Sequence, residues 1–154
     1  MTPRDALSHM DVALSEADAA YARGEVPVGA VIVGPTGAVL ARAGNRTREW
    51  NDPTAHAEIV AIREACDKLG QERLTGCDLY VTLEPCPMCA AAISFARVRR
   101  LYYGASDEKG GGVDNGPRIF SQTTCHHAPE VYGGIAEAEA AALLRKFFAE
   151  RRGP

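Results

Sequence analysis

Two short segments, His56-Ala57-Glu58 and Pro85-Cys86-Pro87-Met88-Cys89, constrain the fold of this chain more than any other feature. His56, Cys86 and Cys89 are side chains of the kinds that bind zinc, and the fold must bring them together if they share one ion. Three such ligands occupy three corners of a zinc tetrahedron and leave the fourth for water. An open position is typical of a catalytic site, since a structural zinc site normally has four protein ligands.

Glu58 lies two residues from a predicted ligand. It is placed to move protons to and from the zinc-bound water rather than to bind the metal. Taken alone, a C-x-x-C pair also occurs in redox centres and structural zinc knuckles, and an H-x-E sequence arises by chance on many helices. The combination favours a catalytic site with one zinc ion per chain.

Both segments are predicted at helix starts. Asp52 is the expected N-cap of the first helix and Pro53 its first residue, so that His56 falls in the first turn. Gly70 is expected to end this helix. Its predicted buried face comprises Ile59, Ile62, Cys66 and Leu69.

The second helix follows a strand predicted at residues 79–83. Pro85 and Pro87 turn the chain into an alanine-rich stretch, residues 90–93, which favours a helix. Cys86 and Cys89 then share one face of the helix start. The positive end of the helix dipole favours their thiolate forms.

Apolar periodicity and glycines predict the other elements. These are a helix marked by Leu7, Met10, Leu14, Ala17 and Tyr21 and ended by Gly24, hairpin strands at 30–33 and 38–43 around the loop 34–37, a strand at 101–103, and an amphipathic helix at 137–151. Helices and strands therefore alternate along the chain. This order predicts an α/β fold with right-handed crossovers and a sheet covered on both faces.

Length and composition set further bounds. With 154 residues, 46% of them hydrophobic, residues 1–154 are expected to form a single domain. No stretch approaches the roughly 18 apolar residues of a membrane span, and residues 1–5 lack the apolar core of a signal peptide. We therefore expect no membrane association. Five cysteines, two of them assigned to metal, suit a reducing cytoplasm better than a disulfide framework.

The net charge of −3 excludes global basic character, so any nucleic-acid binding must be local. Two cationic groups are candidates: Arg97, Arg99 and Arg100, and then Arg145, Lys146, Arg151 and Arg152. Both are equally compatible with solvated charged surface. The three remaining cysteines are expected to be packed or incidental, and Cys125-His126-His127 is expected to line a pocket rim or to pack rather than to bind metal, because adjacent side chains in an extended segment point apart.

The pattern H-x-E followed by P-C-x-x-C is the known signature of zinc-dependent nucleobase deaminases. The chain resembles the cytidine-deaminase-like superfamily, and within it the bacterial tRNA-specific adenosine deaminases. The resemblance extends over nearly the whole chain. Besides the metal motif it is carried by residues 25–31, 44–46, 52–58, 79–86, 141–144 and 147–148.

The resemblance implies a three-layer α/β/α sandwich around a five-stranded mixed sheet. It also implies hydrolytic deamination of adenosine to inosine at the wobble position of tRNA, by a homodimer that binds the anticodon arm. Asn45 is then expected to hydrogen-bond the target base and Asp107 to lie near the ribose of a neighbouring nucleotide. Further expected substrate contacts are Val28, Ala57 and Pro85, and expected RNA contacts are Arg97, Arg145, Lys146, Phe148, Arg151 and Arg152.

In the expected mechanism, Glu58 takes a proton from the zinc-bound water, delivers it to N1 of the adenine and then protonates the departing amino group. Related deaminases of guanine, cytosine or free nucleosides share the motif, so it defines the reaction and not the substrate. The family typically has Met-Ile-His-Ser-Arg where this chain has residues 93–97, Ile-Ser-Phe-Ala-Arg. A deaminase of free nucleobases or nucleosides is therefore the alternative, and a non-catalytic module stapled by zinc is a more remote one.

Overall fold

The computed structural model describes the backbone of residues 3–152 and the side chains of residues 6–151. The elements in this range, in chain order, are α1 (Pro3–Ala22), β1 (Gly29–Val33), β2 (Val39–Gly44), α2 (Ala57–Leu69), β3 (Asp78–Leu83), α3 (Pro87–Phe95), β4 (Arg100–Ala105), a short 3-10 helix η1 (Ile119–Ser121), β5 (Glu130–Tyr132) and α4 (Glu137–Arg152).

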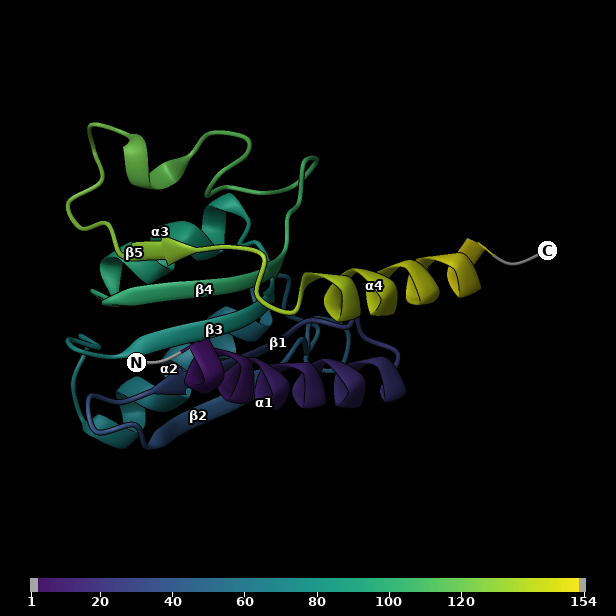
Figure 1. The fold of residues 1–154 in the computed structure, drawn as a ribbon, viewed down its shortest axis with the longest axis horizontal. Helices are drawn as coiled ribbons and strands as arrows, with labels where there is room; N and C mark the ends of the chain where they lie inside the picture. The colour runs from purple at the N-terminus through teal and green to yellow at the C-terminus, as the bar shows by residue number, and fades with distance from the viewer. Residues whose placement is uncertain (1–2, 153–154) are drawn as a thin grey trace.

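The strands form one mixed sheet in the order β2-β1-β3-β4-β5. β1 is antiparallel to both β2 and β3, whereas β3, β4 and β5 are parallel. Helices α1 and α4 cover one face, and α2 and α3 cover the other (Figure 1). The predicted three-layer α/β/α sandwich with a five-stranded mixed sheet is confirmed.

Both faces of the central strands are buried, as continuous apolar runs predict. Along β3, Leu79 and Val81 join the core beneath α2 and α3, while Tyr80 packs on the opposite face with Met10 of α1. β3 therefore belongs to both cores and leads directly into the loop before α3.

Small residues let α1 approach the sheet closely. A Cβ atom at Gly29 would lie 1.9 Å from the carbonyl oxygen of Ala13, so only glycine fits there. The buried face of α1 comprises Ala6, Met10, Ala13, Ala17 and Ala20. The predictions of Met10 and Ala17 on this face are confirmed, but the predicted Leu7 is 51% exposed. The predicted Leu14 and Tyr21 are only half-buried, because close packing of the helix on the sheet places alanines at the contact.

The predicted start of α2 was wrong. The Asp52 carboxylate accepts bonds from the backbone N–H (2.9 Å) and the hydroxyl (2.6 Å) of Thr54, and this local turn competes with a helix. α2 begins at Ala57 with His56 as its N-cap. Its buried face includes the predicted Ile59 but consists mainly of small residues, Ala57, Ala61 and Ala65, together with Val60. The predicted Ile62 and Cys66 are partly buried against this core, and the predicted Leu69 is exposed.

Residue patterns alone also missed β5. This edge strand has only three residues, which is too short for an alternation of apolar and polar side chains to be recognised. It is stabilised by its pairing with residues 100–102 of β4. An ion pair of 2.8 Å between Arg100 and Glu130 joins the two strands. Within residues 3–152, no helix combines the length and apolar character needed to cross a membrane.

Candidate metal centre and active site

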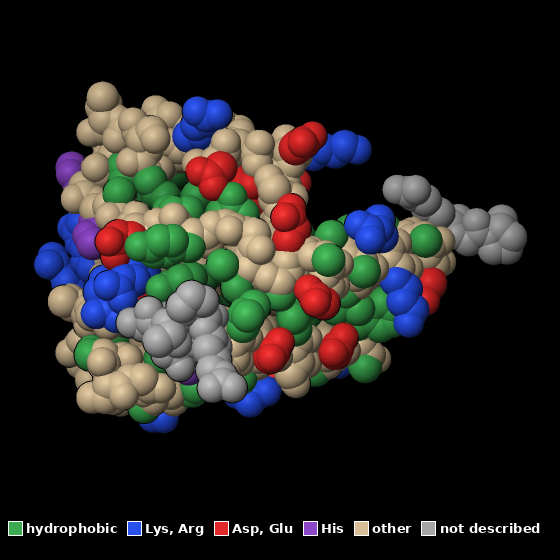
Figure 2. Space-filling view, viewed as in Figure 1, with side chains coloured by type: hydrophobic (Ala, Val, Ile, Leu, Met, Phe, Trp, Pro, Cys, Tyr) green, Lys and Arg blue, Asp and Glu red, His purple; other side chains and the backbone are tan. Residues whose placement is uncertain are grey.

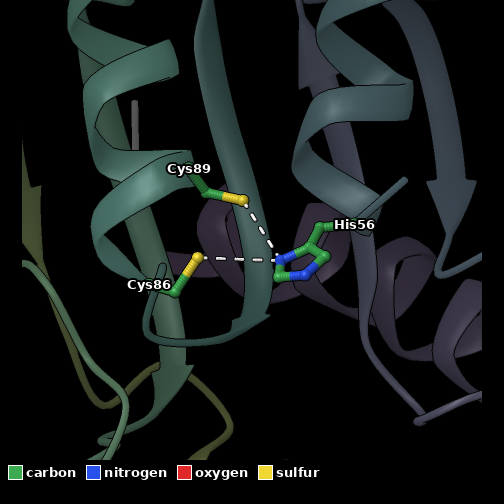
Figure 3. A group of neighbouring side chains, drawn as sticks. All are labelled: His56, Cys86 and Cys89. Atoms are coloured by element: carbon green, nitrogen blue, oxygen red, sulfur yellow. Dashed lines mark hydrogen bonds between the residues drawn. The ribbon is translucent and has the colours of Figure 1, made fainter. Parts of the chain in front are cut away.

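The three predicted ligands meet where α2 and α3 begin (Figure 3). Nδ1 of His56 lies 3.7 Å from Sγ of Cys86 and 3.5 Å from Sγ of Cys89. Zinc bonds of about 2.3 Å to sulfur and about 2.0–2.1 Å to nitrogen, at the tetrahedral angle, separate such ligand atoms by about 3.5–3.6 Å. The donor set therefore fits one zinc ion without rearrangement.

Two helix starts create this geometry. His56 and Cys86 are the N-caps of α2 and α3, each with extended backbone, and Pro87 occupies the first turn of α3. Neither side chain makes an N-cap hydrogen bond, and both are directed to the shared site. Because the positive ends of two helix dipoles converge here, anionic ligands are favoured.

The thiols of Cys86 and Cys89 influence each other's pKa through a hydrogen bond. A hydrogen bond from Cys89 lowers the pKa of Cys86 to about 4 against the opposing effect of burial, and His56 lowers it further. The same hydrogen bond, in which Cys89 is the donor, raises the pKa of the Cys89 thiol, and burial raises it further. Zinc ligands must be thiolates, and a bound cation at this position would favour loss of both thiol protons.

Glu58 lies in the first turn of α2, one residue beyond Ala57, and is only 4% exposed. Burial raises the pKa of its carboxyl group to about 7. A carboxyl group with this pKa can both accept and release a proton near neutral pH.

A cavity of about 290 Å³ adjoins the metal ligands. Its lining residues come from five separate segments and are Val26, Val28, Asn45, Thr47, His56, Glu58, Leu83, Glu84, Cys86, Asp107 and Gly110. Three of the predicted substrate contacts, Val28, Asn45 and Asp107, are among them. Ala57 and Pro85 are not: both are buried, and the structure does not bring their side chains to the cavity wall.

Asn45 performs two tasks at this cavity. Its Oδ1 atom accepts a bond of 2.8 Å from the backbone N–H of Ala57, which caps α2 from outside the helix. This contact fixes the orientation of the amide, since an N–H donor requires oxygen opposite it. The Nδ2 group has no hydrogen-bond partner within the described part of the chain and is available to a ligand in the cavity.

Sequence reasoning missed the buried residue Glu84, which is 2% exposed. Burial alone would raise its pKa, but bonds from the Asp107 backbone, the Asn115 side chain and the backbone of Val113 and Asn115 bring the pKa below its usual value. The carboxylate is therefore ionised at neutral pH. Its position at the end of an apolar strand, directly before Pro85, was the signal for a buried functional charge.

A second hollow, of about 510 Å³, continues from the cavity toward α4 and shares Val26, Leu83, Asp107 and Gly110 with it. In Figure 2 the outline of the molecule is hollowed between the loop that follows β4 and the projecting α4. The residues that line only the second hollow are Ala105, Ser106, Lys109, Ala141, Leu144, Arg145 and Phe148.

The predicted RNA contacts on α4 separate into two groups. Arg145 and Phe148, the latter 44% exposed, line the second hollow. Lys146 instead places its ammonium group 5.2 Å from the centre of the Tyr21 ring. These two groups lie on different sides of the helix.

Arg151 is engaged within the chain. Its guanidinium group donates to the carbonyl oxygen of Gly24 at 2.9 Å and lies 4.5 Å from the centre of the Phe147 ring. The side chain of Arg152 lies outside the described residues. Arg151 therefore has a structural use that its charge alone did not indicate.

Arg97 lies just after α3, whose nine residues span roughly 13 Å from the ligand-bearing start. It borders a separate apolar hollow of about 180 Å³, together with Phe95, Cys125 and His126. The other two arginines of this cationic group form ion pairs, Arg99 with Asp78 and Arg100 with Glu130. Arg97 therefore does not line the catalytic cavity of the chain to which it belongs.

The segment Cys125-His126-His127 packs against α3. Ser94 donates to the His127 carbonyl oxygen at 2.6 Å, and Nε2 of His127 lies 2.7 Å from the Val98 carbonyl oxygen. Among the described side chains, these residues belong to no group arranged to hold a metal ion. The structure places Cys125 and His126 at the rim of an apolar hollow beside α3, while the backbone and ring of His127 pack against α3 and the segment after it.

Comparison with known proteins defines the class. Residues 3–105 match the family described as the cytidine and deoxycytidylate deaminase zinc-binding region. The fold and the three-ligand site are those of this class, and zinc is the cofactor that His56, Cys86 and Cys89 hold.

More similar relatives narrow the assignment. The chain is 68% identical over 143 residues to the tRNA-specific adenosine deaminase of Agrobacterium fabrum, covering 93% of each chain. It is also 68% identical, with a TM-score of 0.87, to a solved structure from studies of A-to-I editing by tRNA:A34 deaminases, covering 89% of this chain and 99% of that one. The chain belongs to the tRNA-specific adenosine deaminase family.

A more distant relative shares the fold and the general chemistry. The guanine deaminase of Nitrosomonas europaea is 25% identical, with a TM-score of 0.81, and the match covers 93% of this chain and 84% of that one.

Proposed function

We propose that the chain is a zinc-dependent hydrolase that converts adenosine to inosine at the wobble position of tRNA. The observation that carries this proposal is the second hollow, which opens from the catalytic cavity and is lined by Lys109, Arg145 and Phe148. A free base needs only the first cavity. A flanking nucleotide needs a continuing groove, a cation for its phosphate and an aromatic ring on which to stack.

When bound, zinc activates a water molecule as the nucleophile for C6 of the adenine. The Glu58 carboxylate accepts a proton from that water and delivers it to N1 of the ring. Glu58 next takes the proton of the new C6 hydroxyl group and transfers it to the 6-amino nitrogen, so that the C–N bond breaks, ammonia leaves and the C6 carbonyl of inosine forms. Adenosine and water are thereby converted to inosine and ammonia.

The cavity walls hold the base for this proton transfer. The Nδ2 group of Asn45 donates a hydrogen bond to a ring nitrogen, and Val28 and Leu83 supply apolar contacts. Asp107 borders both hollows, which suits a contact with the ribose of the next nucleotide. A wobble nucleotide is unpaired in its loop, so the cost of extruding the base is reduced.

We also propose that the enzyme is a homodimer. Phe95 is 76% exposed at the end of α3 and borders the apolar hollow of about 180 Å³. A second copy of the chain would remove this surface from water, and RNA could then meet Arg97 beside the interface. Because the proposed substrate is tRNA, we place the enzyme in the cytoplasm. We also propose that residues 1–154 form a single deaminase domain.

The alternative substrate is a free purine, as in the structurally similar guanine deaminase. The 290 Å³ cavity alone is sufficient for one base. A synthetic anticodon stem-loop with adenosine at the wobble position should be compared with adenine, adenosine, guanine and cytidine, and the products measured by mass spectrometry of the nucleosides. We expect inosine from the stem-loop and little turnover of the free compounds. Turnover of guanine with no reaction of the stem-loop would replace the proposal with the alternative.

A further inference from the structure

Glu84 receives three consecutive backbone N–H groups on one carboxylate oxygen. Oε2 accepts bonds from Val113 (3.1 Å), Asp114 (3.0 Å) and Asn115 (3.1 Å). Backbone turns of this type form concave binding sites for anions. Here the bound anion is a side chain of the same protein, brought from the end of β3.

The other oxygen joins the opposite end of the same loop. Oε1 accepts a bond of 3.0 Å from the backbone N–H of Asp107 and one of 3.4 Å from the Ser106 hydroxyl. The side chain of Asn115 donates to Oε1 at 2.6 Å and to the Ser106 oxygen at 3.0 Å. One carboxylate therefore closes the loop 106–115 at its base.

The loop lies against both the cavity and the metal site. Gly112 donates to the Pro85 carbonyl oxygen at 2.8 Å, and a Cβ at Gly112 would lie 2.6 Å from the nitrogen of Pro87. A Cβ at Gly111 would lie 2.5 Å from Oε2 of Glu84. The loop backbone thus fits closely between the buried carboxylate and the start of α3.

Six donors occupy the carboxylate, which offers about four lone-pair positions. Although Glu84 borders the cavity, its oxygens have no capacity left for a substrate. The cavity wall beside it is formed instead by Asp107 and Gly110, two residues of the loop that it closes.

We infer that Glu84 is a positioning residue of the deamination reaction, whose carboxylate holds the loop 106–115 as the wall against which the nucleotide binds. The inference rests on the proposed function for the identity of the nucleotide. The groups assigned to chemistry, Glu58 and the three ligands, lie outside the loop 106–115. Loss of the Glu84 anchor should therefore weaken substrate binding more than it slows the chemical step.

The test is Glu84→Gln, which keeps the size of the side chain but places an amide donor among N–H donors. With the stem-loop we expect KM to rise at least about tenfold, kcat to stay within about threefold, and zinc content to match the wild type. Hydrogen exchange should accelerate in residues 106–116 but not in α2 or α3. An unchanged KM, or a loss confined to kcat, would overturn the inference.

Glu108→Gln is the matched control. Glu108 is exposed in the same loop and makes no hydrogen bond or ion pair in the described structure, so the variant removes the same charge without removing an anchor. If charge alone mattered, this variant would alter KM as Glu84→Gln does. We expect its loop exchange to match the wild type and its KM not to rise.

Asn115→Ala provides a second variant if Glu84→Gln does not fold. It removes the bonds of the Asn115 side chain to Glu84 and Ser106, and should raise KM about threefold with faster loop exchange. Unchanged KM in this variant with faster exchange would refute the positioning role. A wild-type enzyme that does not react with the stem-loop refutes the proposed function instead, and the exchange measurement still tests the anchor.

Discussion

The side-chain oxygen of Asn45 accepts a hydrogen bond of 2.8 Å from the backbone N–H of Ala57, the residue between the zinc ligand His56 and the acid Glu58. The bond caps α2 with the residue that directly follows β2, since the His56 side chain does not cap its own helix. One amide thus fixes the start of the helix with its oxygen and offers its nitrogen to the base.

These two tasks should separate in variants of Asn45. Asn45→Asp keeps an oxygen for Ala57 at the positive helix end but removes the donor to the base. We expect kcat/KM to fall at least about 100-fold while the melting temperature stays near that of the wild type. Asn45→Ala should lose the cap as well, at a cost of about 1 kcal/mol in the free energy of unfolding. Thermal unfolding and stem-loop kinetics test both, and full activity of Asn45→Asp would contradict the assigned donor.

Zinc content tests the metal site. Because three ligands converge with distances suited to zinc, the purified protein should hold about one zinc ion per chain. Cys86→Ala or Cys89→Ala should lose most of this zinc and lower the melting temperature. Cys66→Ala is the matched control, since Cys66 lies half-buried on α2 outside the ligand group. Metal analysis that finds no zinc in the wild type, or two tightly held ions, would rule out the site as described.

Glu58 should be needed for chemistry and not for metal binding. Glu58→Gln preserves the shape of a residue that is almost fully buried but cannot carry a proton. We expect at least about a 100-fold loss of kcat, with zinc content and melting temperature close to the wild type. Elemental analysis is the decisive measurement, because loss of zinc from this variant would make Glu58 a ligand.

Local residue patterns were sufficient to predict the zinc ligands and most elements of the fold. Few side chains bind zinc, and Pro87 and Gly24 mark helix boundaries by backbone properties that do not depend on distant contacts. The buried apolar strands were also recognisable from local sequence. A continuous run of apolar residues indicates a strand that is buried on both faces.

The features that the sequence did not predict depend on tertiary contacts, which no local residue pattern contains. The start of α2 is set by Asn45, twelve residues before Ala57 in the chain. The buried helix faces are built from alanine, whose small side chain gives a weak hydrophobic signal. The second hollow exists only because α4 packs beside the loop after β4, and the contact of Arg151 with Gly24 spans 127 positions.

Phe95 tests the proposed homodimer. Replacing this exposed ring with Ser should raise the dimer dissociation constant at least about tenfold, because aromatic residues dominate interface energies. Leu69→Ser, which alters an exposed apolar residue at the end of α2, should leave the constant unchanged. Sedimentation equilibrium at micromolar concentration provides the measurement. A monomeric wild type, or a Phe95→Ser variant with unchanged association, would exclude this surface as the interface.

The cations of the second hollow test the RNA contact. Lys109 and Arg145 line that hollow, whereas Arg151 is held by Gly24 and would confound stability with binding if it were replaced. If both cations meet phosphates, the double variant Lys109→Ala/Arg145→Ala should flatten the slope of log affinity against log salt by up to about 1.4, at about 0.7 per phosphate of a single strand. Stem-loop binding should weaken most at low salt.

The control for this double variant is Lys68→Ala/Arg73→Ala. It also removes two positive charges, but from exposed positions far from the hollow. Lys68 lies in the last turn of α2, at the end opposite His56, and Arg73 lies just beyond that end. Since any effect of net charge alone would appear in both double variants, only a contact in the hollow predicts a difference between their slopes. Fluorescence anisotropy of a labelled stem-loop, titrated at several salt concentrations, measures both. Equal slopes for the two variants would show that the RNA does not occupy the second hollow.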